Sequence, residues 1–338
     1  MRDDAGRRSR ALRVPAALRI VLLYGVTLFA IVTVVFVLPR AMPGDPIQSR
    51  EDPTNPLFLQ DPTARQHLLA YYGLDEPLPQ QYVEYLTRVV HGDLGWSIST
   101  NQTVSSLIAA RLPWTALLMG TSIAAASLLS FLAGVAAAWR RSRIADRVLV
   151  VVMTVMRSVP EYALASVLLI VFAVVLRVLP LYGGSTAFAR YSGLWDHVAD
   201  IATHLALPAL SLTLGLTGVK FLLVRNTMIS VLGEDYMVLA RAKGLPVRLL
   251  KYRHAGRNVL LPFLTLLGIQ IGFAVGGAIF VETVFNYPGM GSLILNAVGN
   301  RDYPVLEGTF LTLATAVLLM NLLIELVYRR LDPRVRAQ

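Results

Sequence analysis

Six apolar stretches dominate the sequence, and each is long enough to cross the hydrocarbon core of a membrane as one helix, which takes about 20 residues. They are predicted at Ile20–Leu38, Leu112–Trp139, Val148–Leu176, Ile201–Val224, Val259–Phe285 and Gly308–Tyr328. Hydrophobic residues make up 55% of the chain and charged residues only 15%, which is too apolar for an ordinary soluble domain. The chain is therefore predicted to be an all-α polytopic membrane protein with six transmembrane helices, in a single transmembrane domain over residues 1–338.

Basic residues are distributed unevenly along the chain. Twenty-one of the 31 Lys and Arg residues fall within residues 1–19, 140–147, 225–257 and 329–338, whereas the three other connections between spans hold eight. Basic segments near span ends are retained on the cytoplasmic side, so the tails 1–19 and 329–338 are both predicted to be cytoplasmic. The same bias, with attraction to the lipid bilayer, accounts for the net charge of +10. No nucleic-acid partner is expected, since no basic segment belongs to a recognisable reading fold.

The longest extramembrane connection, residues 39–111, is predicted to be extracytoplasmic and helical. Apolar residues recur with helical spacing at Pro62–Tyr72 and Pro79–Val90, and a glycine follows each segment closely. A compact helical cap between the first and second spans fits this pattern. The Pro- and Gly-rich connection 286–307 instead favours a tight turn or a re-entrant dip.

A hydrophilic interruption at Glu234–Pro262, EDYMVLARAKGLPVRLLKYRHAGRNVLLP, separates the fourth and fifth apolar runs. Its composition predicts a helix up to Lys243, a stop and restart at Gly244 and Pro246, and a second short amphipathic helix at Val247–His254. These helices are too polar to span a bilayer, so the cytoplasmic loop 225–258 is predicted to dock a soluble motor, the other interpretation being a solvated basic face. The predicted contact residues are Glu234, Asp235, Tyr236, Ala240, Arg241, Ala242, Lys243, Gly244, Leu245 and Arg248.

This loop resembles the signature loop of ABC importer permeases, whose coupling helix contacts the ATPase subunit. The family signature begins with Glu-Ala-Ala and places a proline sooner after the glycine than here, where Pro262 follows Gly244 by eighteen residues. That longer spacing resembles the spacing found in the oligopeptide/dipeptide permease branch, in particular in its first permease subunit. Further motifs resemble that subunit in the same order: PGDP from Pro43, YGLDEPLPQQYVEYL from Tyr72, GDLGWS from Gly92, VETVFNYPGMG from Val281, NRDYP from Asn300 and LDPRVR from Leu331.

The resemblance implies the type I ABC importer permease fold in the bacterial cytoplasmic membrane. It implies a second homologous permease as the partner in a heterodimer, two ABC ATPase subunits, an extracytoplasmic substrate-binding protein, and short peptides as substrate, moved by alternating access. Relatives in this branch carry nickel complexes, glutathione or other peptide-like cargo, and these alternatives stay open. Two rivals belong to other classes. An ion-driven secondary transporter would need paired intramembrane carboxylates or inverted repeats, and a membrane-embedded hydrolase would need a nucleophile or metal.

Residues for catalysis are missing from the sequence. It contains no G-x-x-x-x-G-K-[ST] segment, no G-x-S-x-G elbow and no cysteine, and its five histidines lack the spacing of metal ligands. No catalytic residue, metal site or cofactor is therefore predicted in this chain. ATP and magnesium are expected to be bound by the partner ATPase subunits.

Polar residues within the spans are candidates for the translocation path, because a charge in hydrocarbon is costly unless it faces water or a partner. Arg157 lies ten residues after Arg147, about 15 Å along a helix. The alternatives are that Arg157 pairs with Glu161 at i and i+4, and that Glu282 accepts a hydrogen bond from a loop backbone, which is favoured for Glu282. The predicted path residues are Arg157, Glu161, Tyr162, Gln270 and Glu282.

Two further features concern helix packing. Gly272, Gly276 and Gly277 form a small-residue face that is predicted to pack closely, and that face is also a candidate sliding contact with the second permease. Lys220, five residues before Arg225, is predicted to snorkel its ammonium group to the inner surface.

Overall fold

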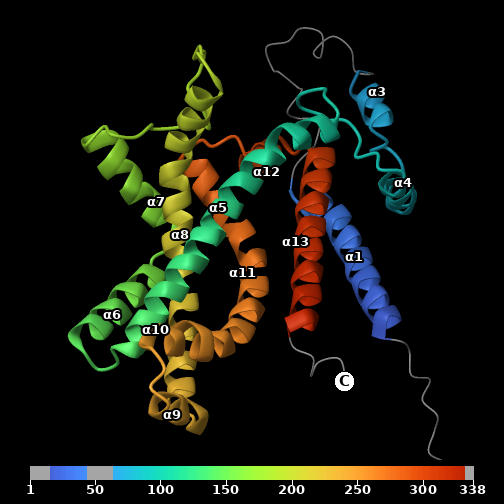
Figure 1. Ribbon diagram of the computed structural model, residues 1–338. Coiled ribbons are helices and arrows are strands. Elements are labelled where there is room, and N and C mark those ends of the chain that lie inside the picture. Colours follow the sequence, from blue (N-terminus) through green and yellow to red (C-terminus); the bar gives the residue numbers. More distant parts are fainter. Residues whose placement is uncertain (1–15, 44–63, 332–338) are drawn as a thin grey trace, which may run out of the picture.

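The computed structural model describes residues 16–43 and 64–331, and nearly all regular structure there is helical. Figure 1 shows two groups of long helices. The first contains α5 (Val104–Trp139), α8 (Leu194–Leu232) and α11 (Gly256–Val284), flanked by α6 (Ile144–Ser158) and α7 (Glu161–Leu168). The second pairs α1 (Ala16–Ala41) with α13 (Tyr303–Leu331), and α12 (Met290–Asn300) connects the groups at the end where α3 (Ala64–Tyr71) and α4 (Leu78–Val90) lie. The predicted all-α polytopic fold is confirmed.

The six predicted spans agree with the helices in number. Five described helices are long and apolar enough to cross a membrane, and one bent pair makes a sixth. Several helices extend beyond the apolar runs: α5 begins at Val104 rather than Leu112, and α13 begins at Tyr303 rather than Gly308. The extensions carry polar side chains, so hydropathy alone does not assign them to the spans.

The predicted third span is a broken helix. The axis turns by 102° between α6 and the segment Glu161–Val175, in which α7 continues into the π-helical turn η1 (Leu169–Val175). Val159 is extended, with ψ of 126°, and Pro160 follows it. Proline lacks an N–H and disfavours helical backbone in the residue before it. The single helix predicted at Val148–Leu176 is therefore wrong.

Small polar side chains join α5 to α8, which share the most extensive helix contact. The Oγ of Ser130 donates to the carbonyl oxygen of Thr217 at 3.0 Å. Gly134 allows close approach, because a Cβ there would lie 2.7 Å from a methyl group of Val224. Small residues and interhelical hydrogen bonds are the usual means of helix association in lipid.

Lys220 lies inside this helix pair. Its side chain is fully buried, and its Nζ donates to the Oγ of Ser127 at 3.2 Å. The predicted snorkelling is wrong because α8 continues for twelve residues beyond Lys220, or about 18 Å. The ammonium group is too far from that helix end to reach it.

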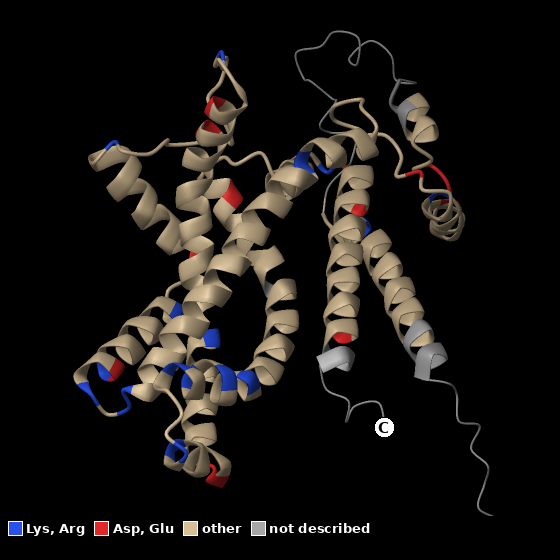
Figure 2. Cartoon of the chain, in the orientation of Figure 1, with Lys and Arg blue, Asp and Glu red and all other residues tan. Residues whose placement is uncertain are grey.

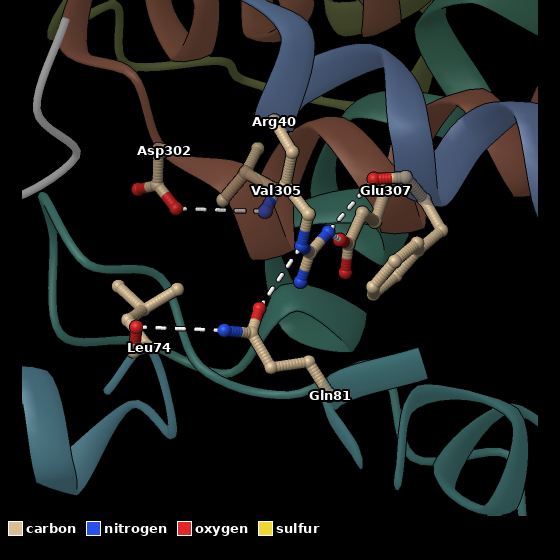
Figure 3. A network of polar contacts seen from close by, with 7 residues as sticks. Arg40, Leu74, Gln81, Asp302, Val305 and Glu307 are labelled. Carbon is tan, nitrogen blue, oxygen red and sulfur yellow. Dashed lines mark hydrogen bonds and ion pairs between the residues drawn. The ribbon is translucent and has the colours of Figure 1, made fainter. Parts of the chain in front are cut away.

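Polar contacts hold α1 against α13 at both ends. Arg40 forms an ion pair with Glu307, and its Nε donates to Oε1 of Gln81 at 3.1 Å (Figure 3). Gln81 belongs to α4 and donates in turn to backbone carbonyls between α3 and α4. Near the other end the hydroxyl of Tyr24 donates to Glu325 at 3.3 Å. The Arg40 network therefore ties α1, α13 and the cap together.

The two helices predicted for the cap correspond to α3 and α4. Gly73 and Gly92, with φ of +64° and +74°, follow them in the left-handed conformation that glycine adopts cheaply. Part of the predicted cap, residues 44–63, lies outside the described residues, and residues 104–111 belong to α5.

The loop after α4 is anchored by Asp302, which precedes α13. The Oγ of Ser97 and the backbone N–H of Ser99 donate to Oδ2 of Asp302 at 2.6 and 2.9 Å, and the N–H of Ile98 donates to Oδ1 at 3.1 Å. Two motifs far apart in the sequence, GDLGWS and NRDYP, thus meet at one buried carboxylate.

Candidate functional site

The polar loop after α8 folds into two short helical segments. α9 spans Asp235–Ala242, and α10 (Val247–Leu249) continues into the π-helical turn η2 (Leu250–Ala255). Gly244 has φ of +70°, and Pro246 precedes α10. The predicted stop and restart are confirmed. The second helix is not a separate unit as predicted, because η2 runs directly into α11.

α9 has one buried face and one exposed face. Met237 and Ala240 are buried and belong to a cluster with Met228 of α8 and with residues of α5 and η2. On the opposite face Val238 is 58% exposed and Leu239 is 56% exposed. α9 is therefore fixed to the membrane helices by one face and presents an apolar surface with the other.

Most of the predicted contact residues are exposed around α9. Glu234, Asp235, Tyr236, Arg241, Ala242, Lys243, Gly244 and Arg248 are exposed, Leu245 is half-buried, and Ala240 is buried. Ala240 therefore attaches α9 to the helices beneath it. Val238 and Leu239 were not among the predicted residues, although their offset from Ala240 on a helix could have identified them as exposed.

Trp139, the last residue of α5, was also not among the predicted residues of this site. The guanidinium carbon of Arg241 lies 5.6 Å from the centre of its ring, and Nζ of Lys251 lies 4.7 Å from the ring centre. Both distances are within the range of cation–π interactions. A single ring at the end of α5 thus positions two basic residues of the loop.

Among the predicted path residues, Arg157 and Glu161 lie on different helices. Arg157 is exposed in the last turn of α6, and Glu161 begins α7 beyond the bend. No ion pair joins them in the described part of the chain. The predicted pairing at i and i+4 is wrong, because the helix does not continue through Pro160.

Glu161 lies where α7 meets α8 and α11. A Cβ at Gly215 would lie 2.8 Å from Cγ of Glu161, and one at Gly277 would lie 3.6 Å from its carboxyl carbon. The next residue, Tyr162, is exposed, and its ring centre is 6.3 Å from that of Phe280 on α11. The structure thus brings Glu161, Tyr162 and Gly277 together. Gly215 also contacts Glu161, and no motif in the sequence indicated this contact.

Glu282 is fully buried and supports the start of α12. The Oγ1 of Thr115 donates to its Oε1 at 2.5 Å, and the backbone N–H groups of Gly291 and Ser292 donate to its Oε2 at 2.6 and 3.3 Å. N–H groups in the first turn of a helix have no partner within that helix. Glu282 does bond to backbone, as favoured, but the donors belong to the first turn of α12 rather than to a loop, and its carboxylate has no exposed surface.

Two glycines of the VETVFNYPGMG motif make room for this arrangement. A Cβ at Gly289 would collide with the Glu282 carboxyl group, and one at Gly291 would lie 2.5 Å from Cα of Ile279. The motif therefore has a structural role, in which Glu282 near the end of α11 caps the start of α12.

The remaining predicted residues lie on α11. Gln270 is buried, and its Oε1 has no hydrogen-bond partner among the described residues. Of the three predicted packing glycines, Gly277 is the most closely packed, Gly272 has its nearest neighbour in Val317 at 3.8 Å from an ideal Cβ, and Gly276 has none within 4 Å in the described chain. The same described ranges contain no group of three His, Cys, Asp or Glu residues that could hold a metal ion.

Comparison with known proteins identifies the family. A protein-family model described as "Binding-protein-dependent transport system inner membrane component" matches residues 127–337. A Brucella ovis protein described as a candidate peptide permease is 40% identical over 310 residues, 91% of this chain and 95% of its own length. A Sinorhizobium fredii protein named as a peptide ABC transporter permease is 35% identical over 308 residues, 89% and 93% of the two chains. The glutathione transport system permease protein GsiC of Salmonella choleraesuis is 35% identical over 314 residues, which cover 92% of this chain and 95% of GsiC. The chain therefore belongs to the binding-protein-dependent transport system inner membrane components, the permeases of ABC importers.

Proposed function

We propose that the chain is a permease subunit of an ATP-driven importer of short peptides and forms half of its translocation path. The names of the relatives, peptide permease and glutathione permease, support peptides as the substrate class. A glutathione-like cargo is the second candidate, supported by the similarity to GsiC. The proposed partners are a homologous second permease, an extracytoplasmic binding protein and two ABC ATPase subunits, which bind the ATP and magnesium.

The exposed face of α9 is the observation that carries this proposal. Val238 and Leu239 are large apolar side chains exposed next to each other on α9, and the buried Met237 and Ala240 hold the helix in place. Burial of exposed apolar surface is the dominant favourable term in most protein–protein association. We therefore assign this face of α9 to the ATPase subunit, with the exposed charged residues around it as the rim.

A double substitution tests the docking face. Val238→Asp with Leu239→Asp is expected to lower co-purification of the ATPase subunits at least tenfold and to abolish uptake, because it puts two carboxylates into an apolar interface. The yield of the permease itself should stay unchanged, since both side chains are exposed. Leu78→Asp, at an exposed leucine of α4, is the matched control. Wild-type ATPase recovery by the double variant would contradict the assignment.

We further propose that both termini are cytoplasmic in a bacterial inner membrane. In support, Figure 2 shows Lys and Arg gathered toward the end of the molecule that carries α9. Single cysteines at the exposed positions Gln66 and Arg248 of this cysteine-free chain are expected to react from opposite sides of intact cells. Reaction of both with an impermeant reagent added outside would overturn this orientation.

The break between α6 and α7 is our proposed polar segment of the translocation path. It offers an exposed guanidinium at Arg157, with Glu161 and Tyr162 just beyond the bend, whereas Gln270 and Glu282 are buried. Arg157→Ala is expected to lower uptake of peptides with a free carboxylate about tenfold, because a charge-assisted hydrogen bond is lost. Uptake of C-terminally amidated peptides should change little. Ser158→Ala is the neighbouring control, and equal losses for both cargo types would exclude carboxylate binding by Arg157.

A further inference from the structure

An open groove of about 570 Å³ lies between the end of α5, the end of α8 and the coupling loop, which is the segment 233–255 that carries α9, α10 and η2. Its wall is mostly apolar and is formed by Trp139, Leu232, Leu245, Val247 and Leu250, with Arg241 as its charged member. Trp139, Leu232 and Leu245 pack against the same cluster that buries Met237 and Ala240. The groove is therefore on the attached face of α9, away from Val238 and Leu239.

Arg241 lines this groove, and Lys251 lies outside the lining but contacts Trp139, which belongs to it. Arg241 and Lys251 both lie over the ring of Trp139, and neither has a carboxylate partner among the ion pairs of the described residues. The lining contains no acidic residue. A ligand that matches both the basic residues and the apolar wall has an anionic head group and an apolar body.

The position of Trp139 sets the depth of the groove in the membrane. Trp139 ends the long apolar helix α5, and three exposed arginines follow it within four residues. Tryptophan is enriched at membrane–water interfaces, and arginine flanks spans on the cytoplasmic side. The groove therefore opens at the level of the lipid head groups of the cytoplasmic leaflet, which is rich in anionic lipid.

We propose that this groove binds an anionic phospholipid, with its phosphodiester held by Arg241 and Lys251 and an acyl chain along the apolar wall. Guanidinium donors match the oxygens of a phosphate group. The volume is within the 300–1,000 Å³ that ligand sites commonly have. Because the lipid would contact both α5 and the coupling loop, it would hold the loop against the membrane helices. The proposal uses the proposed orientation and does not depend on which substrate is carried.

Native mass spectrometry of the purified full chain tests this site without ATPase or substrate. The probes are phosphatidylglycerol and phosphatidylcholine with the same acyl chains. Wild-type protein is expected to retain more phosphatidylglycerol than phosphatidylcholine. Arg241→Gln with Lys251→Gln should weaken that retention at least tenfold, because the charge-assisted hydrogen bonds to the phosphodiester are lost. Arg253→Gln with Arg257→Gln, which removes the same charge from exposed positions of the same segment, should retain it nearly as wild type does.

A second variant guards against misfolding of the first. Val247→Glu alters an exposed side chain of the wall and puts a carboxylate in the groove, so it should also lower retention while the chain stays folded. Equal retention of the two lipids by wild type, or equal retention by the two double variants, would overturn the proposal. Displacement of the lipid by millimolar glycerol phosphate would instead indicate a free-phosphate site. That result would refute a lipid site.

Discussion

Replacing Glu282 with alanine is expected to leave little of the chain stably folded. The change removes the acceptor for Thr115, Gly291 and Ser292 in a fully buried position. Each buried donor left without a partner costs about 1–3 kcal/mol, so the total is about 3 kcal/mol or more. The yield of monodisperse protein and its thermal midpoint in detergent measure this loss.

Two variants separate this structural role from a role in transport. Glu282→Gln keeps one carbonyl acceptor and nearly the same volume, so it should lose less stability than alanine. Thr283→Ala alters an exposed neighbour whose hydroxyl bonds only within its own helix turn, and it should match wild type. A wild-type midpoint for Glu282→Ala, with uptake lost, would make Glu282 a transport residue.

Replacing Arg225 with alanine should lower the stability of the chain by a similar amount, because it leaves a buried carboxylate without its partner. The Nε and Nη2 of Arg225 donate to Asp146 at 2.6 and 2.7 Å, and the side chain of Asp146 is only 3% exposed. Removing one partner of a buried ion pair typically costs about 3–5 kcal/mol. The thermal midpoint and limited proteolysis near α6 measure the effect, since this pair attaches the start of α6 to α8.

The double replacement by leucine, Asp146→Leu with Arg225→Leu, supplies the decisive comparison. It leaves no unpaired charge, so it should recover most of the stability that Arg225→Ala loses. Arg143→Ala, at an exposed arginine nearby, should have no measurable effect. If Arg225→Ala were as stable as Arg143→Ala, the ion pair would not contribute to attachment of α6.

Features determined by local sequence were predictable in this chain. Long apolar runs identified the spans, because backbone polar groups in lipid must be satisfied within helices. Gly244 and Pro246 identified the stop and restart of the coupling loop, since only glycine adopts φ near +70° cheaply and proline cannot continue a preceding helix.

Features determined by tertiary contact were not predictable. Pro160 was visible in the sequence, but the 102° turn follows from how α6 and α7 pack on α8, where Gly215 and Gly218 admit them closely. The helix α12 was missed because its glycines suggested a turn, whereas Glu282 supplies acceptors for its first N–H groups. Trp139 was read as the end of a span, and only the fold places two cations on its ring.

The junction of η2 with α11 has a mechanical consequence. Helical backbone runs without a loop from Val247 to Val284, and α11 alone is 29 residues, about 44 Å. Its far end carries Glu282, which is bonded to the first turn of α12. A movement of the loop after α8 therefore reaches α12 through continuous helical backbone, in which Pro262 is the one proline inside α11.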